Sequence, residues 1–254
     1  MRMPKAGYLT EGMLTTFAGV PFGQGHPYSY PEAKDVLGLA MERLCRHPDL
    51  KTHLNIGPDC LADRAIKGQG WPYVWNVLVL RETGPPSSFE KVPHLTLGIR
   101  RDDVLVKINF PNQMKGEYRK RIVALGPEGF SDLLLRVEGG MRKSLRKALG
   151  FVPCLEVLQR RFRHRSSPPT FDARLEADLR TALPYADRGE VKHQPEWVRM
   201  AFSLFAKKRS NLQLGVGAIF PYDRCARLKT PEALDDFAAA WIACKPVIDV
   251  VLGQ

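Results

Sequence analysis

The chain has 254 residues, 44% of them hydrophobic, so it can bury a sizeable core and is not disordered as a whole. No apolar run approaches the ~20 residues that cross a bilayer, and the N-terminus lacks the apolar segment of a secretion signal, so we expect a cytoplasmic protein that does not enter a membrane. The formal net charge of +11 favours a polyanionic partner such as nucleic acid. The five cysteines are odd in number and widely spaced, which predicts buried, free thiols.

The first predicted elements are a helix and an aromatic strand. Residues 31–46 predict the helix, because a Pro-Glu pair suits the first helical turn and an apolar stripe follows it. Residues 71–82 predict the strand. Its aromatic side chains Trp71, Tyr73 and Trp75 share one face of an extended chain, where they either pack in the core or stack on nucleobases.

A β-hairpin is predicted from two runs of alternating residues, His94–Arg100 and Asp103–Phe110. In each run, apolar branched or aromatic residues occupy every second position, which is the period of a strand. Two such runs with a short charged link most often pair antiparallel, and because the link is neither Asn-Gly nor Asp-Gly it does not specify a turn type. Pro111 ends the second strand because it has no N–H for a ladder.

After the hairpin, helices alternate with two further strands. Residues 115–125 and 127–149 predict helices, the second with a kink or a break at Gly139–Gly140. Strands are predicted at 154–165 and 211–220, and helices at 171–183, 195–209 and from a Thr-Pro-Glu cap to about residue 251.

These elements predict an α+β fold with an antiparallel or mixed central sheet covered by about six helices, in one compact domain over residues 1–254. The segments 94–99 and 211–216 resemble each other, and each precedes an apolar stretch, a proline and a helix. This similarity raises the hypothesis of an internal repeat with halves at about 31–150 and 151–254. The alternative is two similar strands without duplication.

The tetrad His94-Leu95-Thr96-Leu97 resembles the His-apolar-Thr-apolar motif of the 2H phosphoesterases. In that family two such motifs face one cleft, one His is the general base and the other the general acid, and the Thr hydroxyls hold phosphate oxygens. The resemblance implies that His94 and Thr96 act on a phosphodiester with a second histidine. His164 is the nearest candidate, although Arg and Ser replace the apolar positions beside it. The alternative is an ordinary strand histidine.

A second resemblance covers residues 89–106, with the pattern Lys-x-Pro-His-apolar-x-apolar-Gly-Ile and a following Asp. This stretch is similar to the central strand pair of the YktB-like family of uncharacterised bacterial proteins. The resemblance implies an α+β fold and no assigned activity.

The densest cationic segment is 136–165, with nine Lys or Arg side chains against two Glu, more than half of the net charge of the chain. A helix followed by a strand would place these charges on two neighbouring elements, and we expect them to form one groove for phosphates. The alternative is a solvated helix face and an edge strand protected by charge. The residues expected to contact nucleic acid are Arg142, Lys143, Arg146, Lys147, Arg160, Arg161, Arg163 and Arg165.

Three functions are compatible with these patterns. The first is a non-enzymatic binding protein for nucleic acid or another phosphate-rich partner, alone or as a subunit of a larger complex. The second is a phosphodiester-processing enzyme that uses His94 and Thr96. The third is a structural subunit whose basic face meets an acidic protein. No metal or cofactor is expected, because the histidines lack metal-ligand spacing and neither phosphate-loop pattern is present.

Overall fold

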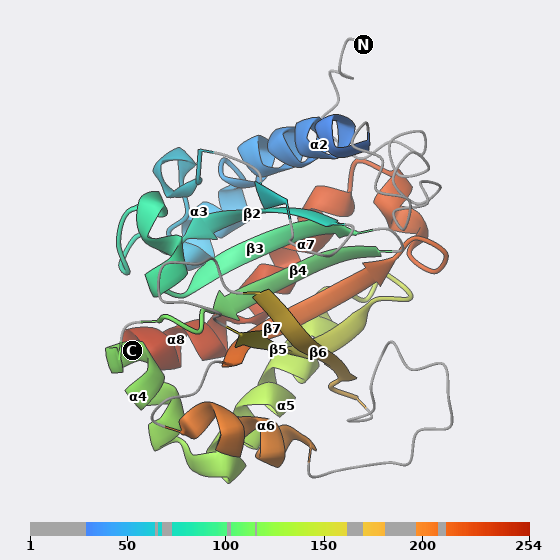
Figure 1. Ribbon diagram of the computed structural model, residues 1–254. Coiled ribbons are helices and arrows are strands. Elements are labelled where there is room, and N and C mark those ends of the chain that lie inside the picture. Colours follow the sequence, from blue (N-terminus) through green and yellow to red (C-terminus); the bar gives the residue numbers. More distant parts are fainter. Residues whose placement is uncertain are drawn as a thin grey trace.

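The computed structural model describes residues 29–63, 66–67, 73–100, 103–114, 116–161, 170–180, 197–207 and 212–254. Its centre is a seven-stranded sheet of order β1-β2-β3-β4-β7-β5-β6 (Figure 1). Every neighbouring pair is antiparallel, so the predicted α+β fold is confirmed. The strands are β1 (Ile66–Lys67), β2 (Tyr73–Val79), β3 (His94–Arg100), β4 (Asp103–Phe110), β5 (Val152–Arg161), β6 (Thr170–Asp178) and β7 (Leu212–Pro221).

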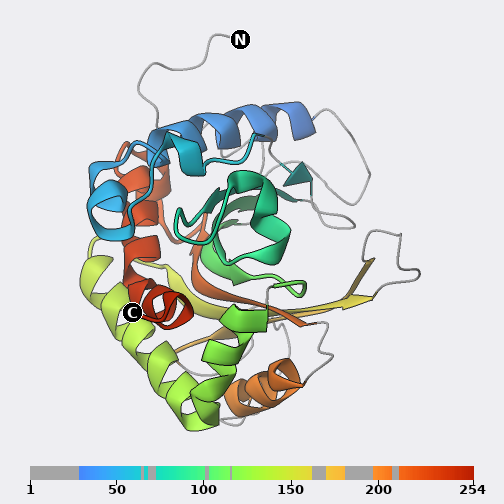
Figure 2. The ribbon, with the colours of Figure 1, turned by 90° about the vertical axis from the view of Figure 1, so that its left-hand side faces the viewer.

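The helices form a layer on one face of this sheet (Figure 2). Helix α7 packs on β4 and β7, α2 packs on β2, β3 and α7, and α5 packs against α6, α7 and α8. The helices are α2 (Ser29–Leu44), α3 (Pro48–Leu54), α4 (Gly116–Ala124), α5 (Gly126–Ser144), α6 (Trp197–Ala206), α7 (Ala233–Ala243) and α8 (Lys245–Leu252). Three 3-10 helices are η2 (Pro58–Cys60), η3 (Pro86–Lys91) and η4 (Ala226–Lys229). None of these described helices is long and apolar enough to cross a membrane.

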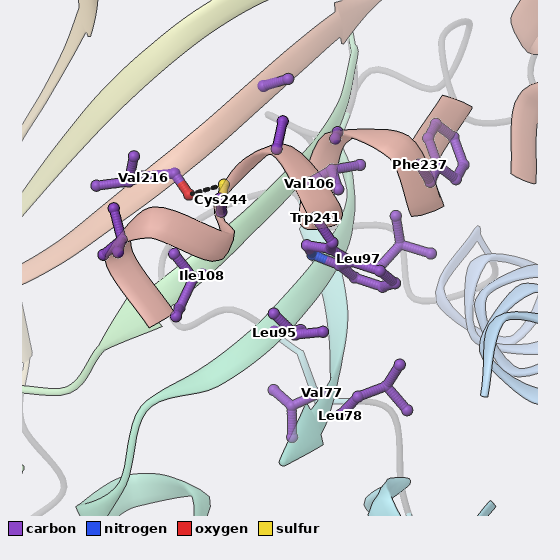
Figure 3. Close-up of a cluster of buried hydrophobic side chains, with 14 of the residues drawn as sticks. Val77, Leu78, Leu95, Leu97, Val106, Ile108, Val216, Phe237, Trp241 and Cys244 are labelled. Atoms are coloured by element: carbon purple, nitrogen blue, oxygen red, sulfur yellow. Dashed lines mark hydrogen bonds between the residues drawn. The ribbon is translucent and has the colours of Figure 1, made fainter. Parts of the chain in front are cut away.

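The core lies between the sheet and helix α7. Trp241 of α7 is fully buried and lies beside Leu97 and Val106 of the hairpin (Figure 3). Its indole N–H donates a hydrogen bond to the Lys107 carbonyl oxygen at 3.2 Å, which satisfies the polar end of a large apolar side chain. The Cys244 thiol at the end of α7 likewise donates to the Val216 carbonyl oxygen at 3.5 Å. All five cysteines are buried and free, as predicted.

The predicted hairpin is confirmed with the predicted bounds. Its register pairs His94 with Asn109 and Ile99 with Val104, so the apolar positions of both strands face the helices. Strand β4 pairs on its other edge with β7, which lies beside β4 although about 100 residues separate them in the chain. The resemblance between β3 and β7 therefore joins two strands that flank β4, and the internal repeat stays a prediction.

Two predicted helices differ from the structure. The prediction of a helix at 171–183 was wrong, because Thr170–Asp178 forms strand β6 and pairs with β5. The alternating residues Phe171, Ala173, Leu175 and Ala177 have the period of a strand, and pairing with β5 favours that period. The last predicted helix is two helices, α7 and α8, because Pro246 can stand in the first turn of α8 but not in a helix interior.

Helix α5 continues through the two glycines that were expected to kink or break it. A Cβ on Gly140 would lie 3.7 Å from the Cβ of Ala243, so the helices α5 and α7 meet at this point at ordinary contact distance. Gly140 therefore lies at the contact between α5 and α7, and the helix is not interrupted there.

We expect Gly217→Ala to lower the free energy of unfolding by about 1–3 kcal/mol, because a new methyl group would be forced into a packed ladder. A Cβ on Gly217 would overlap the Val106 carbonyl oxygen and lie 2.5 Å from the Cα of Lys107. The matched control is Gly139→Ala, where no atom lies within 4 Å of the new Cβ. Because alanine favours a helix more than glycine does, Gly139→Ala should raise the free energy of unfolding by about 0.5–1 kcal/mol. Urea unfolding measures both, and equal stability of the two variants would contradict the close approach of β4 and β7.

Candidate functional site

The face of the sheet opposite the helices carries polar side chains that are buried. Residues His94, Thr96 and Arg100 of β3 point to this side because alternate residues of a strand face opposite ways. The register places Asn109 opposite His94 and Lys107 opposite Thr96. We call this set the polar face, and each member is at most 9% exposed: His94, Thr96, Arg100, Asp103, Lys107, Asn109, Glu156, Glu176 and Gln213.

The polar face is the concave side of a curled sheet. The Arg100 guanidinium of β3 makes an ion pair with the Glu176 carboxylate of β6, and three strands lie between them. In a flat sheet, four steps of about 4.8 Å would put β3 and β6 ~19 Å apart, which is further than the two side chains reach. The strands must therefore coil so that this face closes on itself. Figure 1 shows the steep change of direction between β4 and β6.

Buried ion pairs join the strands across this concave side. Arg100 also pairs with Asp103, and Lys107 pairs with Glu156 of β5. Burial by itself lowers the pKa of Arg100, but the charges of its two carboxylate partners raise it above its usual value, so the guanidinium stays charged. Lys107 reaches Glu156 by lying across β7, and the absence of a side chain at Gly215 makes this route available. A Cβ there would lie 2.6 Å from Lys107 Cδ.

A chain of hydrogen bonds connects three strands beside these ion pairs. His94 Nδ1 lies 3.0 Å from the Val92 carbonyl oxygen, and since a carbonyl only accepts, Nδ1 carries the proton. The Asn109 amide donates to His94 Nε2 at 3.1 Å, and Asn109 Oδ1 accepts from Gln213 Nε2 at 2.9 Å. Burial lowers the pKa of His94 to about 4, with a smaller contribution from the charge of Lys107. The imidazole is therefore neutral at pH 7, with its Nε2 lone pair bound by an amide.

Two polar groups of this face have no hydrogen-bond partner within the described part of the chain. They are the Thr96 hydroxyl and the Nη2 nitrogen of Arg100, both shielded from solvent. Native structures leave few buried polar groups unsatisfied, and each such group calls for a physical explanation.

Of the predicted catalytic residues, the structure describes His94 and Thr96 but not His164. His94 and Thr96 share one face of β3, as the strand period predicted. A neutral histidine with an unprotonated Nε2 has the protonation state of a general base, but Asn109 already donates to that nitrogen. His164 lies outside the described residues, so the predicted acid–base pair stays a prediction.

The predicted basic groove is divided between the two ends of strand β5. Arg142, Lys143, Arg146 and Lys147 are exposed at the end of α5 and in the turn that leads into β5. Residues 160–161 end the same strand, nine residues from its start, and a rise of about 3.3 Å per residue separates the two ends by ~30 Å. The side chains of Arg160 and Arg161, and all of Arg163 and Arg165, lie outside the described residues. The helix residues therefore lie at the opposite end of β5 from residues 160–161, and the contact of all eight predicted residues with nucleic acid stays a prediction.

Two other arginines gather at the end of α5. Arg180 follows β6 and pairs with Asp178 at 2.7 Å. This hydrogen-bonded carboxylate raises the pKa of Arg180, and Glu138 of α5 adds to the effect through its charge. Arg224 follows β7, and a Cβ on Gly150 would lie 2.6 Å from the Arg224 carbonyl oxygen. Sequence reasoning missed both arginines because they are isolated in the sequence and arrive through strand pairing.

We call this surface the basic end: Arg142, Lys143, Arg146, Lys147, Arg180 and Arg224. Three of its cations have a carboxylate partner: Arg142 with Glu138 at 4.0 Å, Arg180 with Asp178, and Arg224 with Asp223 at 3.6 Å. The other three, Lys143, Arg146 and Lys147, form no ion pair with any described residue. The surface therefore keeps an excess of positive charge.

No protein-family model matches the chain, and a search of the curated proteins finds no match. The similarities to 2H phosphoesterases and to the YktB-like family thus stay predictions. Over the described ranges, no group of three or more His, Cys, Asp or Glu side chains is placed to hold a metal ion.

The low pKa of His94 predicts a loss of stability in mild acid. Between pH 6.5 and 4 the unfolded chain binds a proton at this residue and the folded protein does not, so stability falls as the pH falls. Between pH 7 and pH 5, His94 should account for a loss of about 2 kcal/mol in the free energy of unfolding. Urea unfolding at both pH values measures this loss. It should be absent in His94→Gln and present in the control His53→Gln, which changes an exposed residue of α3. An unchanged pH dependence in His94→Gln would show that the imidazole is not buried in its neutral form.

Proposed function

We propose that the protein is a non-enzymatic binding protein that holds nucleic acid at the basic end. The observation that carries this proposal is that three segments bring cations together: the end of α5 with the turn after it, the turn after β6, and the turn after β7. Lysine and arginine side chains on such a surface neutralise phosphates and release counterions without reading the base sequence.

The charge distribution of α5 supports the same surface. Its first turn carries Glu128, which pairs with Arg199 at 3.2 Å, and its last turn carries Arg142 and Lys143. Cations at a helix C-terminus are favoured by the helix dipole, which by itself accounts for those two side chains. The dipole does not account for Arg180 or Arg224, which come from other segments. A binding role explains why all of them share one end of the molecule.

Sequence-independent phosphate contacts are the expected mode of binding. Lys143, Arg146 and Lys147 have no competing carboxylate among the described residues, so they are the cations most available to phosphates. An acidic protein would meet the same surface, and a competition experiment with polyglutamate separates this alternative from nucleic acid.

The test is a fluorescence-anisotropy titration of a 20-base-pair duplex at several salt concentrations. The triple variant Lys143→Ala, Arg146→Ala, Lys147→Ala should bind more weakly, and the slope of log affinity against log salt should fall by roughly 2–3 because up to three phosphate contacts are lost. The matched control is the triple variant Lys34→Ala, Lys51→Ala, Lys120→Ala, which removes the same charge from exposed positions elsewhere.

Several outcomes would contradict the proposal. Equal salt slopes for the two triple variants would show that the basic end does not contact phosphates. Tight binding of polyglutamate with no binding of duplex or single strand would point to an acidic protein instead. The variant Arg160→Ala, Arg161→Ala should keep the wild-type slope because these residues end β5 on its far side, and a large loss there would move the site.

A further inference from the structure

One large apolar side chain is exposed beside the cations of the basic end. Leu149 is 75% exposed, the highest value among the large hydrophobic side chains that the structure describes. It lies in the turn between α5 and β5, two residues after Lys147 and three after Arg146, so at most about 8 Å separates the Cα atoms of Leu149 and Lys147. An isolated exposed leucine is ordinary on a protein surface, but this one stands where the surface would meet phosphates. A partner that buries it must present apolar atoms next to its phosphates.

The turn that carries Leu149 is fixed on both sides. Leu145 and Ala148 are each 1% exposed and belong to the main core, and the Ala148 N–H donates to the Leu145 carbonyl oxygen at 3.0 Å. Gly150 has a φ of +91°, and a Cβ on it would lie 2.6 Å from the Arg224 carbonyl oxygen in the turn after β7. Leu149 is therefore held away from the core by neighbours that are themselves anchored, and it can press on a partner without the turn giving way.

The side chains at this surface favour a double strand over a single strand. Proteins hold single-stranded nucleic acid largely by stacking its bases on aromatic rings. Here Phe151 packs on Phe220 at 6.3 Å between ring centroids, and the Tyr222 hydroxyl donates to the Arg100 carbonyl oxygen at 2.9 Å. In the part of the chain that the structure describes, every exposed large hydrophobic side chain is aliphatic: Leu135, Leu149, Met200 and Leu204.

The minor groove of duplex DNA combines apolar atoms and phosphates at the required distance. It is about 6 Å wide and has a phosphate backbone along each side. Proteins that enter it pair cations with an aliphatic wedge, such as leucine, which slides between two base pairs, partly unstacks them and kinks the duplex. An anionic membrane also offers both kinds of group. However, even one myristoyl chain gives only marginal membrane binding, and the side chain of Leu149 is far smaller.

We propose that the basic end binds the minor groove of duplex DNA and that Leu149 inserts between two base pairs and kinks the duplex. This inference rests on the proposed nucleic-acid binding, and it adds the form of the nucleic acid and the way in which it is deformed. Sites with a pyrimidine–purine step such as TA should be preferred, because these steps unstack easily.

The test measures affinity and bending separately. A 20-base-pair DNA duplex with a central TA step carries a donor dye at one end and an acceptor dye at the other, so kinking by saturating protein raises the energy transfer between them. Leu149→Ala should weaken binding by about 5–30-fold, because most of the apolar contact is lost. Its slope of log affinity against log salt should equal that of wild type, because no phosphate contact is lost. The energy transfer at saturation should fall towards that of free duplex.

Leu135→Ala is the matched control. It removes the same side chain from a position of α5 that is 59% exposed, nine residues before the end of the helix and so about 14 Å along its axis. This variant should keep the affinity and the energy transfer of wild type. Leu149→Met, which preserves an aliphatic wedge, should keep the energy transfer as well.

The outcomes separate this inference from the function on which it rests. Equal affinity and equal energy transfer for Leu149→Ala and wild type would overturn the insertion and leave phosphate binding by the cations intact. Tighter binding of single-stranded DNA than of the duplex would also overturn it. Absence of binding to any nucleic acid would remove the proposed function and this inference together. Binding to vesicles of phosphatidylserine and phosphatidylcholine that depends on Leu149, without bending of the duplex, would assign the leucine to a lipid surface instead.

Discussion

The contact of Arg100 with Glu176 is the constraint on which the rest of the architecture depends. It joins the third and the last strand in the order of the sheet, and it closes only if the intervening strands coil. Both partners are buried, and the loss of one would leave an uncompensated charge, which in proteins is destabilising by about 3–5 kcal/mol. The ion pair thus couples the curvature of the sheet to its stability. The same curvature makes the polar face concave and separates it from the apolar face that the helices cover.

The central strands are buried on both faces, but the two faces have different chemistry. Toward α7, the strands present aliphatic side chains that pack around Trp241. On the other side they present a network of ion pairs and side-chain amide hydrogen bonds, in which burial keeps His94 neutral and Lys107 pairs with Glu156. Each polar group in such a network needs a hydrogen-bond or ion-pair partner, because an unpaired polar group is destabilising in the low dielectric of the protein interior. Among the described residues, the two groups that lack one are the Thr96 hydroxyl and Arg100 Nη2, which lie on the same side of β3 with Gly98 between them.

The cations of the basic end come from several chain segments that end close together. The insertion of β7 between β4 and β5 places the end of β7 beside the start of β5, and so beside the turn after α5. The end of β6 reaches the same place, because β6 pairs antiparallel with β5. Arg224 and Arg180 thus join cations that are close together in the sequence. The proposed phosphate-binding surface is a product of strand order, whereas the polar face is a product of strand register.

Local pattern determined much of this fold. The alternation of residues in His94–Arg100 and Asp103–Phe110 is a property of neighbouring residues, so the hairpin, its bounds and the shared face of His94 and Thr96 were predictable. Most helices followed from their caps and apolar stripes for the same reason. Long-range pairing decided the rest. Strand β6 was mistaken for a helix because its partner β5 favours the extended form, and Gly140 of α5 lies against Ala243, about 100 residues away in the chain. Side-chain chemistry is written in the sequence, but only the tertiary structure sets which groups are buried, which are paired, and which are left without a partner.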